Sequence, residues 1–539
     1  MDSAATAVLE PPRPLSRPRH TVRAAARLAR NAEFWLVLVL SAAVFAVHDV
    51  PYLLRVPFWT DEAWVAVTLR FPLGQLPAVT SSTPIGWSLL LRLFDVGGQQ
   101  SERLLPLAFA GLAVATGYVF ARGLGWSRRW HAVFAGALAA VAALMSPTML
   151  IRDDLKQYTA DACLALAVLA ALSRLEREWS RRRLGLLAAV AAGGMLLSST
   201  TAFVAAAAFA GLALVQLMRR AWSRLAETAV AALAAGAGMG LVYEVFDARA
   251  VVPGLTAFWQ GYYVPLRQGP KATLDYLRHN LALMHSTIGL GPTWSILLFA
   301  LLGVVVLVRV ARPATAAAAV ALAPEMILVS ALKKYPLLDQ RTSTFLFAII
   351  AVLAAVGVAG LCTLIAGNAP KPSSPRYLSA LALAMAAVAA FVAGGWSDVR
   401  LHPLSTEDVR TQVDYVYAHR APDDVILVNS NSSWGFAYYW PQGAPAQQAN
   451  SFVLQKYVPV FPDQPQILVA ASRDTPHVEA AVLEAIRRAR AHPGARIWIV
   501  RTHPTRVENA AWTAAYQRYG LTAQPVDSAG LAVVTLGGG

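Results

Sequence analysis

The sequence has few charged side chains for its length. Asp, Glu, Lys and Arg make up 14% of its 539 residues, whereas hydrophobic residues make up 56%. Soluble globular domains are about 25% charged, so this composition excludes an ordinary soluble protein. We therefore expect a polytopic α-helical membrane protein.

Cysteine is nearly absent as well. Cys163 and Cys362 each lie inside an apolar run, which excludes a disulfide framework and a cysteine-based zinc site. No GxGxxG or P-loop motif marks a nucleotide site. The net charge of +15 reflects Arg clusters between apolar runs, which are typical of cytoplasmic loops. No basic patch belongs to a soluble domain of a kind that binds nucleic acid. We therefore expect no nucleic-acid partner.

Apolar runs long enough to cross a bilayer recur along the chain. Lys and Arg are denser in the segments that would be inside if the N-terminus is cytoplasmic, so the positive-inside rule favours this orientation. An odd number of spans then places the C-terminal region outside. The composition is rich in Ala and Arg, as in bacteria with GC-rich genomes, so we expect the inner (plasma) membrane of a bacterium. The expected spans, about eleven, are residues 34–50, 104–121, 131–150, 160–175, 184–199, 201–217, 228–246, 293–308, 314–332, 343–365 and 377–396.

Three regions follow from this pattern. Residues 1–33 are basic and Pro-rich and are expected to be a cytoplasmic tail before a retained helix, not a signal peptide. Residues 34–396 are expected to form the membrane domain, with long outer loops at 51–103 and 247–292. Residues 397–539 alternate short apolar runs such as "DVILVN" and "RIWIV" with amphipathic segments such as "HVEAAVLEAIRRARAH". This alternation predicts an extracytoplasmic α/β domain.

Two adjacent carboxylates, Asp61 and Glu62, lie in "VPFWTDEAWVAV" of the first outer loop. A carboxylate at the centre of a bilayer costs about 2.5–3.5 kcal/mol, so the pair either lies outside the hydrocarbon or is retained for chemistry. One interpretation is a solvated pair, or the first turn of a helix after Thr60 as N-cap. The other is a catalytic base. Adjacent carboxylates point in different directions, so at most one of them acts as the base.

The segment "LIRDDLKQYTADA" between two spans is also rich in ionisable groups. It contains Asp153, Asp154, Lys156 and Tyr158, which either line a water-filled cleft or form a solvated turn with internal ion pairs. The two aspartates offer oxygen ligands for a divalent cation, but two carboxylates are too few to specify a metal. Metal dependence therefore stays open.

A third polar segment, "KKYPLLDQRT", contains Lys333, Lys334, Tyr335 and Arg341. Cations on the outer side run against the usual bias of Lys and Arg toward the inside. They either anchor the chain to lipid headgroups or clamp a phosphate through charge-assisted hydrogen bonds.

The order of the motifs carries a resemblance. "WTDEAWVAVTLRFPLGQL" is followed by "STPIGWSLLLRLF", "LKQYTAD" and, later, "DQRTSTFLFAIIAVLAAVG". This order resembles the GT-C superfamily of integral-membrane glycosyltransferases, above all the branch of the protein O-mannosyltransferases and the lipid A aminoarabinose transferase. The similarity covers residues 34–175 and, more loosely, 330–365. Thr83, Pro84 and Ile85 replace the His-Pro-Pro of the family pattern, so that histidine has no counterpart here.

The resemblance implies transfer of a hexose or pentose, with inversion, from a polyprenyl-phosphate donor to an acceptor hydroxyl on the extracytoplasmic face. Asp61 is then the matched general base, and Glu62, Asp153 and Asp154 are candidates for orienting it or binding the acceptor. The acceptor would be a glycan, lipid or protein of the cell envelope, with membrane lipids as further partners. Candidates for binding the donor phosphate are Arg103, Lys156, Tyr158, Lys333, Lys334, Tyr335 and Arg341.

Two other functions stay open at this point. A lipid-linked glycan polymerase or ligase would share the polyprenyl donor and the outer cations but would need no first-loop base. A transporter or flippase would use Asp61 as a gate residue and the C-terminal domain as a regulator. Formation of a new glycoside distinguishes an enzyme from a transporter.

Overall fold

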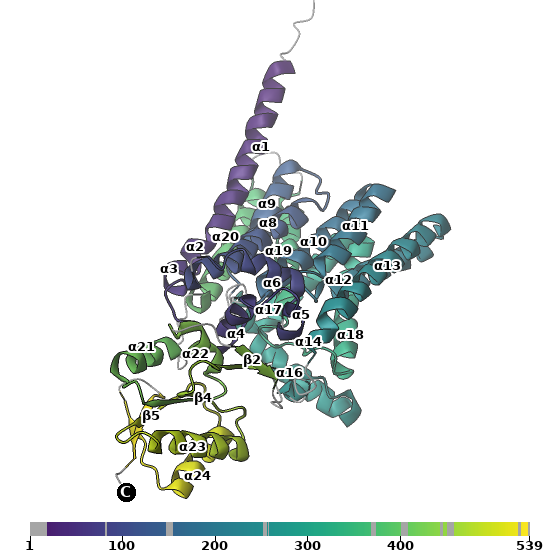
Figure 1. Ribbon diagram of the computed structural model, residues 1–539. Helices are drawn as coiled ribbons and strands as arrows, with labels where there is room; N and C mark the ends of the chain where they lie inside the picture. Colours follow the sequence, from purple (N-terminus) through teal and green to yellow (C-terminus); the bar gives the residue numbers. More distant parts are fainter. Residues whose placement is uncertain are drawn as a thin grey trace, which may run out of the picture.

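Every predicted span coincides with a helix in the computed structural model (Figure 1). The structure describes residues 19–80, 83–96, 98–146, 155–251, 256, 258–367, 373–399, 408–441, 446–449, 457–526 and 530–536. The helices at the predicted spans are α1 (Arg19–Ala42) with α2 (Val44–Val47), α8 (Leu104–Arg122), α9 (Arg129–Leu144), α10 (Tyr158–Arg177), α11 (Arg181–Gly194), α12 (Thr201–Met218), α13 (Trp222–Val242), α17 (Thr293–Arg309), α18 (Pro313–Ala331), α19 (Thr344–Ala366) and α20 (Pro375–Val399).

Seven helices of the described part are long and apolar enough to cross a bilayer, and three shorter apolar helices accompany them. Helices satisfy every backbone polar group internally, as the bilayer core requires. The chain is therefore a multi-pass membrane protein, while the number of eleven spans stays a prediction.

The membrane helices pack around α19, which contacts α8, α9, α10, α17 and α20. Glycines allow α17 and α19 to approach closely. A Cβ atom on Gly303 of α17 would collide with the Leu353 carbonyl, and a Cβ atom on Gly357 of α19 would collide with the Phe299 carbonyl. Small residues at such crossings let the backbones of membrane helices touch.

The loops at one end of the bundle contain short helices. Between α1 and α8 these are α3 (Val50–Leu53), α4 (Thr60–Leu69), α5 (Leu76–Val79), α6 (Ile85–Arg92) and α7 (Gln99–Glu102). Between α13 and α17 they are η2 (Tyr243–Asp247), α14 (Ala248–Ala250), η3 (Gln260–Tyr262), η4 (Leu266–Gln268) and α16 (Pro270–Ile288). The two loops contact each other where α5 packs against η2 and α14. The Trp87 amide also donates to the Leu196 carbonyl between α11 and α12 (3.1 Å), and the Tyr276 hydroxyl donates to the Leu337 carbonyl before α19 (2.8 Å).

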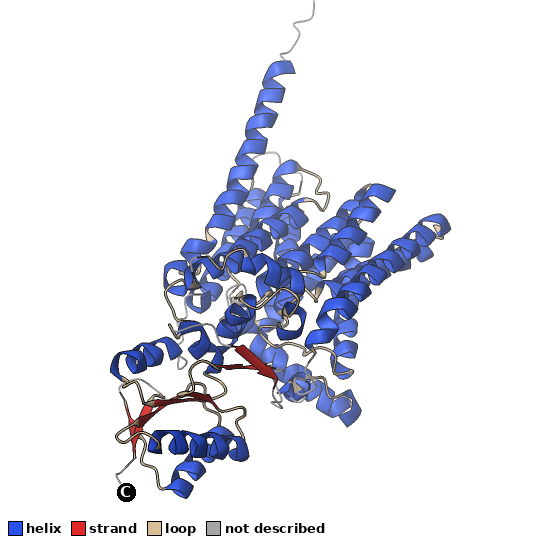
Figure 2. Ribbon diagram, in the orientation of Figure 1, coloured by secondary structure: helices blue, strands red, loops and turns tan. Residues whose placement is uncertain are grey.

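The strands of the described residues all belong to the C-terminal region (Figure 2), which confirms the predicted alternation of strands and helices. Its elements are α21 (Val409–His419), β1 (Val425–Val428), α22 (Ser433–Tyr439), β2 (Ala446–Ala449), β3 (Tyr457–Val460), β4 (Ile467–Val469), α23 (Thr475–Arg490), β5 (Arg496–Val500), α24 (Arg506–Tyr519), β6 (Gln524–Pro525) and β7 (Ala532–Thr535). The main sheet has the order β4-β1-β5-β7-β6, in which β4, β1 and β5 are parallel. The strands β2 and β3 form a separate antiparallel pair.

The two faces of the main sheet have different neighbours. Val425 and Leu427 of β1 face α23 and α24, whereas Ile426 and Val428 belong to a core shared with α4 and α6. In this shared core the Trp64 and Trp434 ring centres lie 6.1 Å apart. The C-terminal region is therefore docked on the loop between α1 and α8, at the end of the bundle where Figure 1 shows α4, α16 and α22.

Candidate active site

The helix α4 carries both acidic residues in its first turn, where the helix dipole favours negative charge. Its N-cap is Trp59, so the helix begins at Thr60, one residue earlier than the sequence indicates. The two carboxylates then separate. Glu62 is buried, whereas the Asp61 side chain keeps 23% of its surface exposed.

Glu62 is held by a bidentate ion pair with Arg103. The Arg103 guanidinium donates from Nε to Oε1 at 2.9 Å and from Nη2 to Oε2 at 2.7 Å. It also donates to the Val56 carbonyl at 2.6 Å and lies over the Phe58 ring. Burial raises the pKa of Glu62, and the charge of Arg103 opposes that rise. The phosphate-binding role of Arg103 stays a prediction, and this geometry does not favour it.

Asp61 lies between two cations that come from distant parts of the chain. Lys156 Nζ donates to its Oδ2 at 2.8 Å, and Arg341 Nη1 donates to the same oxygen at 3.4 Å. The Lys156 side chain is only 7% exposed. The segments before α10 and before α19, each singled out in the sequence for its charges, thus meet the loop between α1 and α8 at one carboxylate.

The cations determine the protonation of Asp61. Burial alone would raise its pKa, but the charges of Lys156 and Arg341, the Lys156 hydrogen bond and the charge of His503 hold the pKa below its ordinary value. Asp61 is therefore ionised at neutral pH, and as long as both cations contact it, it is a weak base.

Aromatic rings flank both cations. Lys156 Nζ lies 5.7 Å from the centre of the Trp64 ring, and the Arg341 guanidinium lies 5.5 Å from the centre of the Trp259 ring. Cations within about 6 Å of a ring face are attracted to it. The rings therefore help to hold the cations and place flat apolar surfaces near Asp61.

The remaining predicted residues have other surroundings. The Tyr335 hydroxyl donates to the Thr342 carbonyl (2.8 Å), and burial raises the pKa of Tyr335 well above its ordinary value. Lys333 Nζ donates to Gln260 Oε1 at 3.2 Å, and Lys334 is exposed. Their phosphate-binding roles, and that of the buried Tyr158 at the start of α10, stay predictions.

Asp153 and Asp154 lie outside the described residues, and their roles in orienting the base or binding the acceptor stay predictions. Within the part of the chain that the structure describes, no three His, Cys, Asp or Glu side chains are grouped as a metal site would need. The possible divalent cation therefore stays open.

The C-terminal region adds residues that the sequence did not single out. Thr60 Oγ1 donates to the Asn431 carbonyl (3.1 Å), and Arg473 Nη2 donates to Asn431 Oδ1 (2.6 Å). The charges of Arg473 and His503 both act on Asp61. These residues follow β1, β4 and β5, and ligands of open α/β sheets bind at the carboxyl ends of parallel strands. The polar run "NSNSS" directly after β1 was the available signal in the sequence.

No family model and no curated protein match the chain. Among solved structures, the crystal structure of ArnT from Cupriavidus metallidurans bound to undecaprenyl phosphate matches with a TM-score of 0.52 and 14% identity, over 93% of this chain and 97% of that chain. The chain has the GT-C fold.

The GT-C resemblance seen in the sequence is therefore confirmed for the fold. AglB from Archaeoglobus fulgidus, in complex with an inhibitory peptide and a dolichol-phosphate, matches with a TM-score of 0.47 and 12% identity over 88% of this chain and 70% of that chain. The arabinofuranosyltransferase AftD from Mycobacteria also gives 0.47, at 14% identity, over 94% of this chain and 40% of that chain. The match to ArnT shows the shared fold alone and says nothing about the sugar or the acceptor.

Proposed function

We propose that this protein transfers a sugar, with inversion, from a polyprenyl-phosphate donor to an acceptor hydroxyl on the extracytoplasmic face of the membrane. The observation that carries the proposal is the Asp61 carboxylate held by Lys156 and Arg341 beside the membrane helices. The GT-C fold supports it, because ArnT, which has that fold, was crystallised with undecaprenyl phosphate. The acceptor class is a glycan, lipid or protein of the cell envelope.

Asp61 acts as the general base in this reaction. The acceptor oxygen forms a bond to the anomeric carbon of the sugar, the bond from that carbon to the phosphate oxygen breaks, and the acceptor proton passes to Asp61. A carboxylate of low pKa cannot deprotonate an alcohol beforehand, so proton transfer accompanies bond formation. Attack opposite to the leaving phosphate inverts the anomeric centre.

Lys156 and Arg341 stabilise the leaving phosphate. Its negative charge grows as the glycosidic bond breaks, and fixed cations in a partly desolvated site stabilise such charge strongly. Arg341 can bind phosphate oxygens in two places at once, which orients the leaving group. Trp64 and Trp259 offer flat faces for the sugar ring next to these cations.

Donor binding and activation of the base are coupled in this scheme. Both cations contact Asp61 in this structure, so a donor phosphate competes with Asp61 for them. When the cations turn to the phosphate, Asp61 loses the charges that hold its pKa down. The pKa then rises toward its ordinary value, and the base becomes stronger when the donor is in place.

The experiment compares Asp61→Asn with Lys156→Met in purified protein. Undecaprenyl phosphate is the binding probe, and labelled undecaprenyl-phosphate hexoses and pentoses, with cell-envelope extract as acceptor, report transfer. We expect Asp61→Asn to lower transfer by about 10²–10⁴-fold while it binds undecaprenyl phosphate as tightly as the wild type or more tightly. Lys156→Met is expected to weaken both, whereas Lys271→Met, at an exposed lysine of α16, leaves both unchanged.

Full transfer by Asp61→Asn would remove Asp61 as the base. Movement of a lipid-linked sugar across liposomes without a new glycoside would replace the enzyme by a flippase. Glu62→Gln serves as a folding control. It breaks the buried pair with Arg103, so we expect it to lower thermal stability before it changes phosphate binding.

A further inference from the structure

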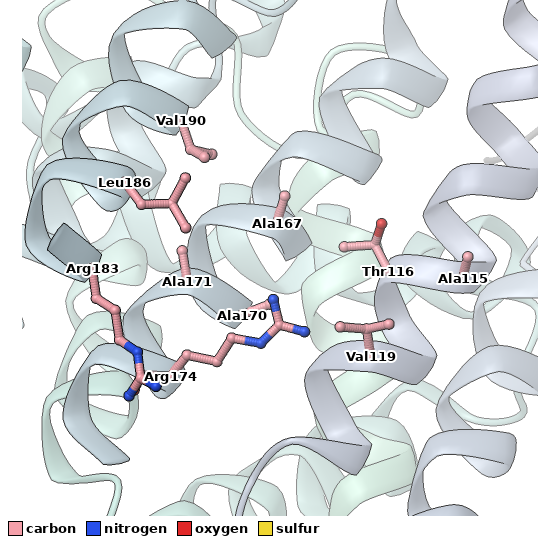
Figure 3. Close-up of a pocket in the computed structure, with 10 residues that line it drawn as sticks. All are labelled: Ala115, Thr116, Val119, Ala167, Ala170, Ala171, Arg174, Arg183, Leu186 and Val190. Atoms are coloured by element: carbon pink, nitrogen blue, oxygen red, sulfur yellow. The ribbon is translucent and has the colours of Figure 1, made fainter. Parts of the chain in front are cut away.

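A second candidate site lies in the membrane domain, near the end opposite to Asp61. An open cavity of about 350 Å³ is lined by residues of α8, α10 and α11. Figure 3 shows its lining, in which Ala167 and Ala171 of α10 face Thr116 of α8 and Leu186 of α11. At 1.5 Å per residue, Arg174 at its edge lies about 24 Å along α10 from the end that carries Tyr158. The cavity is therefore separate from the Asp61 site.

Small side chains create this cavity. The face of α10 between its two neighbours consists of alanines, which do not fill the space between helices in the way that leucine would. The surrounding surface is apolar and partly exposed, with Leu186 54% exposed. In a membrane such a groove is filled by hydrocarbon, because an empty apolar space forfeits van der Waals contacts.

Two guanidinium groups lie at the edge of the cavity (Figure 3). Arg183 is fixed by an ion pair with Glu178 and by donation to the Glu178 carbonyl at 2.9 Å. Arg174 has no carboxylate partner within the described residues. The nearby Glu176 is occupied, since it accepts from the Ala314 amide at 2.7 Å and from the Thr315 amide at 2.8 Å.

The charges at this edge therefore do not cancel. Glu178 compensates Arg183, and Glu176 is turned to the start of α18, so Arg174 supplies a net positive charge beside an apolar groove. This combination matches an anionic lipid, which has a phosphate next to its hydrocarbon chains.

We propose that this cavity binds an anionic glycerophospholipid of the leaflet opposite to Asp61. One acyl chain would lie along the alanine face of α10, and the phosphate would contact Arg174 with Arg183 beside it. The cavity is at the small end of the roughly 300–1,000 Å³ range of ligand sites, so it holds part of a chain and leaves the headgroup outside at the guanidinium groups. The inference is independent of the proposed sugar transfer.

The experiment measures lipid binding to the full-length protein in detergent. Phosphatidylglycerol, phosphatidylcholine and undecaprenyl phosphate are titrated separately, with retained lipid counted by native mass spectrometry and the thermal midpoint recorded. One cation near a lipid phosphate contributes about 1 kcal/mol, so we expect Arg174→Gln to weaken phosphatidylglycerol binding about fivefold. Arg177→Gln, at an exposed arginine on the same helix end that does not line the cavity, is the matched control and should bind as the wild type does.

A second variant tests the groove without changing charge. Ala171→Leu fills the cavity and should abolish the retained lipid while leaving the protein folded, because the new side chain replaces the acyl chain. Equal binding of phosphatidylcholine and phosphatidylglycerol, or equal losses in Arg174→Gln and Arg177→Gln, would overturn the proposal. Preferential retention of undecaprenyl phosphate through Arg174 would instead assign the cavity to the carrier lipid.

Discussion

At the scale of residues, two neighbouring carboxylates have opposite surroundings. Both oxygens of Glu62 are bound by one buried arginine, and this pair ties α4 to the start of α8. Asp61 shares one oxygen between two cations and stays partly exposed. The buried Glu62–Arg103 pair is inaccessible to a ligand and stabilises the fold. The cations at Asp61 lie beside a partly exposed carboxylate and can turn to an incoming anion.

The low pKa of Asp61 leads to a prediction for the pH dependence of transfer. Because its pKa is lowered, Asp61 becomes protonated only at a pH below the ordinary pKa of an aspartate. The stability that its ion pairs contribute therefore persists at neutral pH and is lost as the pH falls through the lowered pKa. The profile of kcat/KM reports the free enzyme and that of kcat reports the complex. If donor phosphate draws the cations away, the acid limb of kcat lies at higher pH than that of kcat/KM.

Rates measured from about pH 3 to pH 8, at saturating and at limiting donor, check this order. Coincident acid limbs would mean that Lys156 and Arg341 stay on Asp61 throughout the reaction. An acid limb that survives in Asp61→Asn would assign the titration to another group.

At the scale of elements, local patterns predicted most of the fold. Runs of apolar residues placed the membrane helices, because a bilayer leaves few alternatives to a helix. The alternation in the C-terminal part placed β1, β5 and α23 (Figure 1). The start of α4 was missed by one residue, since Trp59 supplies the N-cap in place of Thr60.

The partners within the candidate site were harder to predict. The sequence marked Asp61, Lys156 and Arg341 as separate clusters, but no local pattern shows that the two cations share one oxygen. It also grouped Arg103 with them, although Arg103 binds Glu62. Which cation meets which carboxylate depends on how α10 and α19 pack, and that is a property of the whole bundle.

The crossing of α17 and α19 gives a prediction at this scale. Gly357→Ala would push a methyl group into the Phe299 carbonyl, and overpacking of this kind costs about 1–3 kcal/mol. We expect a lower thermal midpoint in detergent. Gly240→Ala is the control, because a Cβ atom there meets nothing within 4 Å, and this variant should keep or slightly raise the midpoint. Equal midpoints for the two variants would show that the helices shift apart freely.

At the scale of the whole molecule, the C-terminal sheet forms part of the candidate site. The core around Trp64 and Trp434 joins it to the loop between α1 and α8. The Thr60 hydrogen bond to Asn431 fixes the carboxyl edge of the parallel strands beside the start of α4. The C-terminal region thus supplies polar groups to the candidate site. The sequence alone did not predict that this region contacts the membrane domain there.

Arg473 provides the test of this arrangement. It follows β4, donates to Asn431 and carries a charge that acts on Asp61, and a hydrogen bond to a charged group is worth about 1.5–3 kcal/mol. We expect Arg473→Gln to lower transfer about tenfold or more, and Arg473→Lys to restore part of the loss through its charge. Arg487→Gln removes an exposed arginine of α23 that pairs with Glu484 and should transfer sugar at the wild-type rate. The measurement is kcat/KM at matched thermal stability. Wild-type transfer by Arg473→Gln would show that the C-terminal sheet only packs against the site, whereas an equal loss in Arg487→Gln would point to general damage of the domain.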